Sequence, residues 1–353
     1  MSAARAEAPV TGPATGPVLE VRDLHVQIAT RRGIVRAVDG VSIEVPRGEA
    51  VGLVGESGSG KSMTLRAILG VLPGEARITS GEVLLDGTDL VPLPASSLNR
   101  IRGPKLAMIF QEPMSALNPV MRVGWQIAEG PQVHLGFSRA KAAERAVELM
   151  RRVGIPDPER RFRSFPHEFS GGMRQRVMIA IALSCDPEVI LCDEPTTALD
   201  VTIQDQILRL LAKLCRESGV SLVFVTHDLP VVAQLCQHLA VMYGGQIVET
   251  GPVQDVFSRP QHPYTLGLLR SAPDVEEVRD SLVPIPGSPP SLISPPSGCR
   301  FHPRCQFAED DCQTTMPPLR LLAGGRATAC LHHERCDEVL ETEGTWQGAG
   351  DNR

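Results

Sequence analysis

Hydrophobic and polar residues alternate in the first part of the chain and later give way to short, fully apolar runs. Alternation over 18–28 and 41–45 predicts half-buried antiparallel strands. Strands buried on both faces are predicted by apolar runs at 50–54, 106–110, 188–192 and 221–225. Helical patterns at 138–153 and 203–217 separate some of these runs, which indicates parallel βα units. The predicted fold class is therefore α/β, with a strand-rich lobe at its beginning.

The same patterns divide the chain into regions. Helical periodicity dominates from about 93 to 187, which predicts a helical subdomain inserted between two halves of the sheet. Thirteen of the thirty prolines lie between Pro252 and Pro318, where long helices and central strands are disfavoured. The predicted regions are a flexible tail (1–17), a main domain (18–250), an appended Cys- and Pro-rich region (251–336) and a second flexible tail (337–353).

Composition narrows the classes of protein. A chain of 353 residues with 42% hydrophobic residues can form a sizeable core and an appended part. The net charge of −6 and the aromatic content of 4% argue against nucleic acid as a main partner, which would need a basic, aromatic surface. We find no apolar run long enough to span a membrane and no secretory signal, and we expect a soluble, cytosolic chain.

A glycine-rich segment joins the apolar run at 50–54 to a helical pattern. It fits the phosphate-binding motif G-x-x-x-x-G-K-[ST]. The nucleotide-binding residues predicted from it are Gly55, Glu56, Ser57, Gly58, Ser59, Gly60, Lys61, Ser62 and Met63. Backbone N–H groups of such a loop converge on phosphates, Lys61 can reach the β- and γ-phosphates, and Ser62 can ligate Mg²⁺. The alternative, an ordinary Gly-Ser loop, does not account for the strand-loop-helix context.

Two carboxylates end the apolar run at 188–192. Acidic residues at the carboxyl end of a parallel strand face the ligand crevice of an α/β sheet. Asp193 is placed to hold Mg²⁺, and Glu194 to polarise a water aimed at the γ-phosphorus. Without the phosphate-binding loop, a solvated strand end would be an equally good interpretation.

Together with four further segments, these motifs resemble the ATP-binding subunits of ABC transporters, and most closely the oligopeptide/dipeptide importer branch. The resemblance spans about residues 18–335. The four segments are IFQEPMSALNP with Gln111, SGGMRQR with Ser170, Gly171 and Gly172, TTALD with Asp200, and FVTHDL with His227. The resemblance implies a P-loop NTPase fold: a RecA-like parallel sheet, an antiparallel β lobe and a helical signature subdomain.

The resemblance also implies roles for these residues. Gln111 would be the Q-loop glutamine that touches Mg²⁺ and water, and His227 the switch histidine. With Lys61 and Glu194 they form the predicted catalytic set, while Ser62, Gln111 and Asp193 would hold Mg²⁺. Ser170, Gly171 and Gly172 would form the signature loop, at a helix N-terminus suited to a phosphate, and Asp200 would belong to the D-loop.

In this family one chain does not supply both loops to one ATP. The resemblance implies a head-to-tail dimer with a second ABC ATPase subunit, either a copy or a related chain, in which Ser170 and Gly172 of one subunit cover the γ-phosphate held by the other. It also implies two transmembrane permease subunits, an extracytoplasmic solute-binding protein, and a peripheral location on the cytoplasmic face of the membrane.

Two residues depart from the general ABC pattern. Met173 replaces a glutamine in the signature, as is familiar in the peptide-importer branch. Val35 stands where an aromatic residue usually stacks on adenine. Because a base–aromatic contact contributes roughly 1–3 kcal/mol, we expect weakened discrimination between ATP and GTP.

Nine cysteines, an odd number without an export signal, make a disulfide framework a poor interpretation. Four of them lie close together in the Pro-rich region: Cys299, Cys305, Cys312 and Cys330. Their spacing does not decide between tetrahedral Zn²⁺, a [4Fe–4S] cluster and free thiols. The resemblance favours the [4Fe–4S] cluster, because members of this branch carry one here, and Cys336 would be a spare or replacement ligand.

The resemblance leaves the cargo open. Peptides are favoured, and nickel and other small solutes are alternatives within the branch. A soluble ABC ATPase of DNA repair or translation would carry long coiled-coil insertions or two tandem ATPase halves, and this chain shows neither. The remaining alternative is a nucleotide-gated binding module that senses redox state through its cysteines.

Overall fold

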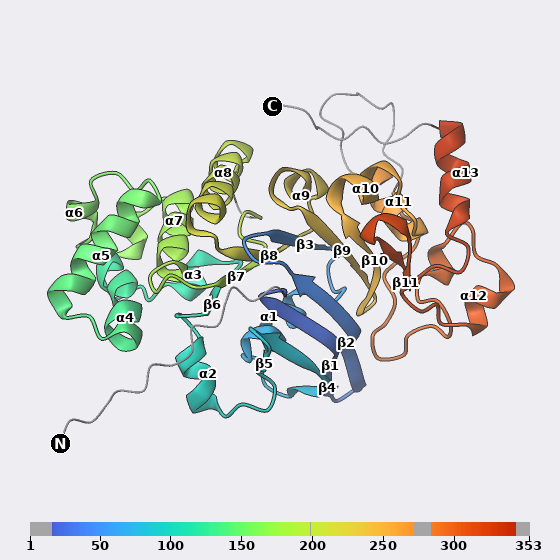
Figure 1. The fold of residues 1–353 in the computed structure, drawn as a ribbon, viewed down its shortest axis with the longest axis horizontal. Coiled ribbons are helices and arrows are strands. Elements are labelled where there is room, and N and C mark those ends of the chain that lie inside the picture. The colour runs from blue at the N-terminus through green and yellow to red at the C-terminus, as the bar shows by residue number, and fades with distance from the viewer. Residues whose placement is uncertain (1–15, 198, 272–283, 344–353) are drawn as a thin grey trace, which may run out of the picture.

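The computed structural model describes residues 16–197, 199–271 and 284–343. The two tails expected at 1–17 and 337–353 therefore lie largely outside the described residues. Figure 1 shows an elongated molecule with a helical layer at one end, two sheets in the middle and the C-terminal region at the other end.

The first sheet is an antiparallel lobe with the strand order β2-β1-β4-β5. Its strands are β1 (Leu19–Thr30), β2 (Gly33–Val45), β4 (Ala76–Leu85) and β5 (Thr88–Asp89). Buried and exposed side chains alternate at the end of β2, where Val41, Ile43 and Val45 face the core. Alternation therefore marks a one-sided strand here, as the sequence predicted.

The second sheet is mixed, with the order β11-β12-β10-β9-β3-β8-β7-β6. Its strands are β3 (Ala50–Val54), β6 (Leu106–Ile109), β7 (Val189–Asp193), β8 (Ser221–Thr226), β9 (His238–Tyr243), β10 (Gln246–Pro252), β11 (Arg320–Leu321) and β12 (Ala327–Thr328). Its middle strands, from β9 to β6, pair in parallel. Strand β3 is buried on both faces: Ala50 and Val54 pack into one apolar cluster and Val51 and Leu53 into another. The four predicted buried strands are confirmed.

Helices cover this sheet and form the layer beyond β6. The helices before the end of β10 are α1 (Lys61–Leu69), α2 (Ala95–Ile101), α3 (Pro113–Ala116), α4 (Val123–Leu135), α5 (Arg139–Arg152), α6 (Pro158–Arg161), the 3-10 turn η1 (Pro166–Glu168), α7 (Gly171–Ala182), α8 (Val201–Ser218) and α9 (Leu229–Leu235). The helical subdomain expected over 93–187 is interrupted, because β6 within that range pairs with β7 in the main sheet.

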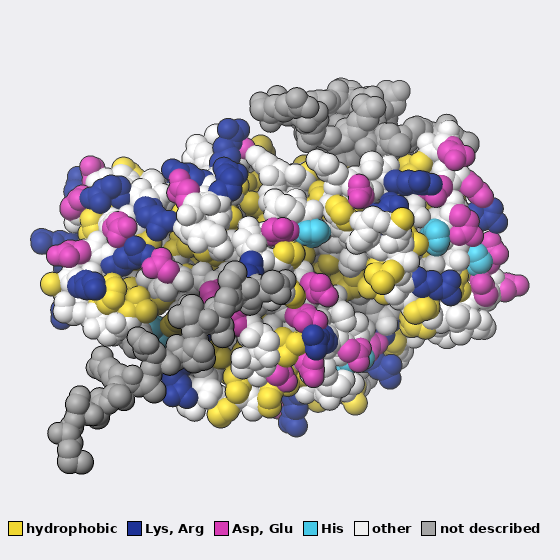
Figure 2. Space-filling view, in the orientation of Figure 1, with side chains coloured by type: hydrophobic (Ala, Val, Ile, Leu, Met, Phe, Trp, Pro, Cys, Tyr) yellow, Lys and Arg dark blue, Asp and Glu magenta, His cyan; other side chains and the backbone are white. Residues whose placement is uncertain are grey.

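The helical layer formed by α4 to α7 has a mixed surface. On the face in Figure 2, Lys and Arg side chains are interspersed with Asp and Glu at this end of the molecule. Its interior is apolar, with Leu149 and Met150 of α5 and Ile179 of α7 fully buried. No helix in the described part of the chain is both long and apolar enough to span a bilayer.

The C-terminal region, which the sequence predicted as an appended part, contributes strands to the main sheet. Its elements are α10 (Val253–Ser258), α11 (Pro263–Ser271), η2 (His302–Arg304), α12 (Asp310–Thr314), β11, η3 (Ala323–Gly325), β12 and α13 (Glu334–Glu343). Strand β12 pairs with β10, so the sheet continues into this region. Helix α13 includes 337–343, where the sequence predicted a frayed tail. Asp337 anchors it by accepting hydrogen bonds from Arg259 and Gln261.

Candidate nucleotide-binding site

The glycine-rich loop occupies the turn between β3 and α1, and its glycines are required by close packing. A β-carbon on Gly55 would lie 2.1 Å from the Met242 carbonyl oxygen, and one on Gly60 would lie 2.3 Å from that of Ala37. Both glycines have positive φ angles, 152° and 111°. The loop backbone is therefore held directly against β9 and β2, and its amides precede the N-terminus of α1.

Lys61 lies inside the loop and is only 5% exposed. Its Nζ donates hydrogen bonds to the carbonyl oxygens of Gly55 (2.7 Å) and Glu56 (3.0 Å). Burial lowers the pKa of Lys61, and the carboxylates of Glu194, Asp193 and Glu56 oppose that shift. The Ser59 hydroxyl is buried without a hydrogen-bond partner among the described residues. A buried cation beside an unpaired hydroxyl fits an anionic phosphate group.

The other predicted residues of the loop differ in exposure. Ser57 and Gly58 are exposed at its tip, whereas the Met63 side chain packs against the apolar cluster of the antiparallel lobe. Packing therefore occupies part of the half-buried Met63 side chain, and its backbone N–H in the first turn of α1 can still face a nucleotide.

Ser62 and Asp193 meet across the site. The Ser62 hydroxyl donates to Asp193 Oδ1 at 2.7 Å, which joins the start of α1 to the end of β7. Asp193 is 2% exposed, and burial raises its pKa, while the hydrogen bond from Ser62 opposes that shift. One hydroxyl and one carboxylate oxygen are ligands that Mg²⁺ accepts, so this pair fits a magnesium site.

Glu194 lies at the centre of the polar cluster. Its Oε2 accepts hydrogen bonds from Gln111 Nε2 (3.3 Å) and Thr197 Oγ1 (2.9 Å), and lies 3.4 Å from His227 Nδ1. The residue has a φ of 46°, a left-handed conformation that is strained for a side chain of this kind. Its backbone N–H donates to Val225 O, which fixes the strained turn to β8. The structure thus brings three predicted catalytic residues into contact.

The signature loop and the D-loop are positioned as helix caps. The Ser170 hydroxyl accepts a hydrogen bond from Met173 N–H at the start of α7, and Asp200 accepts one from Ile203 N–H at the start of α8. A β-carbon on Gly172 would lie 2.6 Å from Ile203 Cγ2, so the two helix starts touch. Across the described ranges, no hydrogen bond or ion pair connects these residues to the phosphate-binding loop. Ser170 and Gly171 are exposed and available to another molecule.

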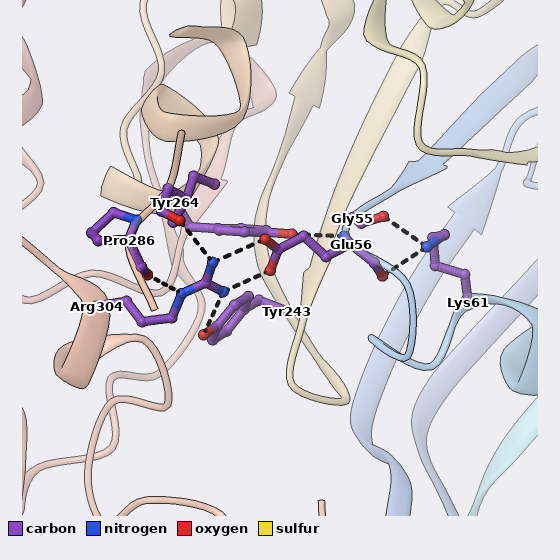
Figure 3. Close-up of polar contacts among 8 residues, drawn as sticks. Gly55, Glu56, Lys61, Tyr243, Tyr264, Pro286 and Arg304 are labelled. Atoms are coloured by element: carbon purple, nitrogen blue, oxygen red, sulfur yellow. Dashed lines mark hydrogen bonds and ion pairs between the residues drawn. The ribbon is translucent and has the colours of Figure 1, made fainter. Parts of the chain in front are cut away.

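Sequence reasoning missed several contacts. Thr197, which donates a hydrogen bond to Glu194, follows it by three residues and carried no distinct signal in the sequence. Tyr264 and Arg304 reach Glu56 from the C-terminal region, as Figure 3 shows. They belong to the segments HPYT (262–265) and GCRFHPRC (298–305), and no sequence spacing connects them to a loop more than 200 residues earlier.

The four clustered cysteines line one cavity. Cys299, Cys305, Cys312 and Cys330 surround it together with Phe301 and other C-terminal residues. All nine cysteines lie within the described residues and are free thiols. Burial raises the pKa of Cys305 to about 11 and that of Cys330 to about 12. Cys336 is fully buried and is not among the residues that line the cavity.

Comparisons with known proteins agree with this geometry. Residues 38–197 match the ABC transporter family, and residues 248–312 match the oligopeptide/dipeptide transporter C-terminal region. A solved ATP-binding cassette, described as a dimer in a post-hydrolysis state bound to ADP and Pi, is 29% identical with a TM-score of 0.61. The match covers 67% of this chain and 98% of that chain.

Curated relatives match over nearly the whole chain. A probable peptide ABC transporter ATP-binding protein of Sinorhizobium fredii is 50% identical over 94% of this chain and 98% of its own length. The oligopeptide transport ATP-binding protein OppD of Salmonella typhimurium is 46% identical over 89% of this chain and 93% of its own. The dipeptide transport ATP-binding protein DppD of Lactococcus lactis is 51% identical over 82% of this chain and 84% of its own length. The chain therefore belongs to the ATP-binding proteins of the oligopeptide/dipeptide ABC importer family, and is an ABC-type ATPase that drives transport.

Proposed function

We propose that this chain hydrolyses MgATP to energise the uptake of peptides across the cytoplasmic membrane. The observation that carries the proposal is the contact between Ser62 and Asp193 at 2.7 Å, beside the Glu194 cluster. It unites a phosphate-binding loop, a Mg²⁺-binding pair and a candidate general base at one edge of the sheet.

The residues divide the chemistry among them. Lys61 and the loop amides would bind the triphosphate, while Ser62, Asp193 and Gln111 would hold Mg²⁺, which neutralises phosphate charge. Glu194 would accept the proton of the attacking water. Gln111 and His227, both in contact with Glu194, would orient that water and sense the γ-phosphate.

A second subunit would complete the site. Ser170 and Gly171 are exposed at the N-terminus of α7, without a partner in the described phosphate-binding loop, and the related cassette of known structure is dimeric. In a head-to-tail dimer, Ser170, Gly171 and Gly172 of one subunit would cover the γ-phosphate held by the other, and Asp200 would lie at the interface. Bound ATP then holds the subunits together, and its hydrolysis lets them separate.

The wider assembly follows from the relatives, whose names include peptide, oligopeptide and dipeptide transport. We expect two transmembrane permease subunits, an extracytoplasmic solute-binding protein and a peripheral position on the cytoplasmic face of the membrane. The binding protein and the permease would select the cargo, so nickel or another small solute is the alternative.

The cysteine cavity would hold a [4Fe–4S] cluster, with Zn²⁺ as the alternative. Four cysteines line one cavity, which supports a shared metal group, and most side chains between 306 and 326 are exposed, so the local apolar core is small. Cys299, Cys305, Cys312 and Cys330 would be the ligands, and the bonds would cross-link the segment in place of that core. An anaerobic preparation should be brown and contain iron and sulfide, whereas a colourless one with stoichiometric zinc would contradict the cluster.

Reconstitution tests the transport function. The chain, its permease subunits and its binding protein are assembled in liposomes, and ATP hydrolysis is measured with and without peptide-loaded binding protein. Peptide should stimulate ATP hydrolysis and should accumulate inside the liposomes as ATP is hydrolysed. Stimulation of hydrolysis by nickel alone would favour the alternative cargo. A hydrolysis rate that is the same with and without the permease subunits would favour a redox-sensing module.

A further inference from the structure

Arg304, in the C-terminal region, reaches into the phosphate-binding loop (Figure 3). Its Nη1 and Nη2 donate to the two carboxylate oxygens of Glu56 at 2.7 and 2.9 Å. The Arg304 side chain is 5% exposed and that of Glu56 is 27% exposed, so the guanidinium is shielded from water while the carboxylate retains partial access to it. Paired, charge-assisted hydrogen bonds of this geometry fix both the distance and the orientation of a carboxylate.

The guanidinium is itself held in place from other segments. Its Nε donates to Pro286 O at 2.7 Å, and Nη1 also donates to the Tyr243 hydroxyl at 3.2 Å. The Arg304 Cζ lies 5.7 Å from the centre of the Tyr243 ring. Because these contacts come from β9 and from the 284–286 segment, Arg304 is a fixed support and Glu56 is the group that it restrains.

The C-terminal region holds the backbone of Glu56 as well as its side chain. The Glu56 N–H donates to the hydroxyl of Tyr264, a fully buried residue of α11, at 2.8 Å. The Glu56 carbonyl oxygen accepts the hydrogen bond from Lys61 Nζ. Arg304 and Tyr264 therefore act on the residue whose carbonyl helps to position the phosphate-binding lysine.

The charges of Glu56 and Arg304 indicate how their contact affects nucleotide binding. Glu56 places a carboxylate beside a loop that must bind a polyanion, and that carboxylate already acts on Lys61. Arg304 neutralises it at hydrogen-bond distance. Without Arg304, the Glu56 carboxylate would repel the triphosphate and be free to attract Lys61 away from it.

We propose that Arg304 is a positioning residue for ATP binding, which acts through Glu56. It neutralises the Glu56 carboxylate and anchors the loop in the arrangement in which Lys61 can meet the phosphates. Arg304 directly precedes Cys305 in the sequence, so the residue that supports the nucleotide site is next to one that lines the cysteine cavity.

The test measures the affinity of the full-length chain for a fluorescent ATP analogue with Mg²⁺. Arg304→Gln should weaken binding about tenfold, because the Glu56 carboxylate left without its partner is 27% exposed and solvent screens much of its repulsion of the triphosphate. Adding Glu56→Gln to that variant should restore most of the affinity, because the repelling carboxylate is removed with its partner. A purely structural contact would not show this rescue.

Arg259→Gln is the matched control. Arg259 also forms a bidentate pair, with Asp337 at 2.6 and 2.9 Å, between two elements of the C-terminal region. This variant should bind the analogue with unchanged affinity. Thermal unfolding of all variants is recorded in parallel.

Two results would overturn the proposal: unchanged affinity in Arg304→Gln, or a double variant that binds as weakly as the single one. If Arg304→Gln does not fold, Arg304→Lys replaces it. The lysine keeps the charge but loses the bidentate geometry, and should weaken binding about threefold. Unchanged affinity in that variant would equally refute the role of Arg304.

Discussion

At the scale of single residues, the site depends on a few charged groups whose neighbours determine what they do. Glu194 and Asp193 are adjacent in sequence but differ in environment. Asp193 is buried against Ser62, whereas Glu194 is turned by its left-handed backbone toward Gln111 and His227. One carboxylate is thus suited to a metal ion and the other to a water molecule.

Glu194→Gln should separate binding from hydrolysis. The amide keeps the size of the side chain but cannot accept a proton from water, so the hydrolysis rate should fall by roughly 10²–10⁴. Binding of MgATP should be retained, because Lys61, Ser62 and Asp193 are unchanged. Steady-state phosphate release and equilibrium nucleotide binding provide the two measurements, and a loss of both together would contradict the role assigned to Glu194.

Val35→Tyr should sharpen the choice of base. Val35 lies in β2, beside Arg36, whose N–H donates to Leu292 O of the C-terminal region. A tyrosine there could stack on adenine, and one such contact contributes roughly 1–3 kcal/mol. The ratio of kcat/KM for ATP to that for GTP should be small in the wild type and larger in the variant. A strong preference for ATP in the wild type would refute this prediction.

At the scale of elements, the sequence predicted most of the helices and strands that have a clear apolar periodicity. The buried strands, the antiparallel lobe and helices α5 and α8 were predicted, because apolar patterns report directly on which faces are covered. The edge strand β12 was not, since two residues are too short for a pattern and its pairing with β10 depends on distant chain. The same holds for Arg304 and Tyr264, whose contacts arise only when the chain folds back.

Glu249 of β10 shows how elements are joined at a buried point. Its carboxylate oxygens accept hydrogen bonds from the backbone N–H groups of Gln261 and His262, just before α11. Burial is the largest influence and raises the pKa of Glu249 to about 7. The folded state therefore retains a proton that the unfolded state loses near pH 4.5, and stability falls as the pH rises from about 4.5 through 7.

Glu249→Gln should remove that part of the pH dependence. We expect the difference in unfolding free energy between wild type and variant to change by on the order of 1–3 kcal/mol between pH 4.5 and 8, with the wild type losing relative stability. Urea unfolding at several pH values measures it, and the comparison cancels the other titrating groups that both proteins share. A difference that stays constant with pH would show that Glu249 does not titrate in this range.

At the scale of the whole molecule, the proposed catalytic site has two halves that lie apart in one chain. Within the described residues, no hydrogen bond joins them. The phosphate-binding loop and the Glu194 cluster form one half. The exposed start of α7 forms the other half and packs against Ile203 at the start of α8 of its own chain. A head-to-tail arrangement predicts that each half can be inactivated in a different subunit.

Mixing two inactive variants tests that arrangement. Lys61→Ala should abolish nucleotide binding at its own loop but leave its signature loop intact, whereas Ser170→Arg should block the signature loop but leave the phosphate-binding loop intact. Each variant alone should show little hydrolysis, because every paired site contains one damaged half. A mixed dimer has one site with both halves intact, so mixing equal amounts should recover up to about a quarter of wild-type hydrolysis: half of the randomly formed dimers are mixed, and each has one of two sites working. If the mixture stays inactive although co-purification of differently tagged variants shows that mixed dimers form, the two loops do not act on the same ATP and the head-to-tail arrangement is wrong.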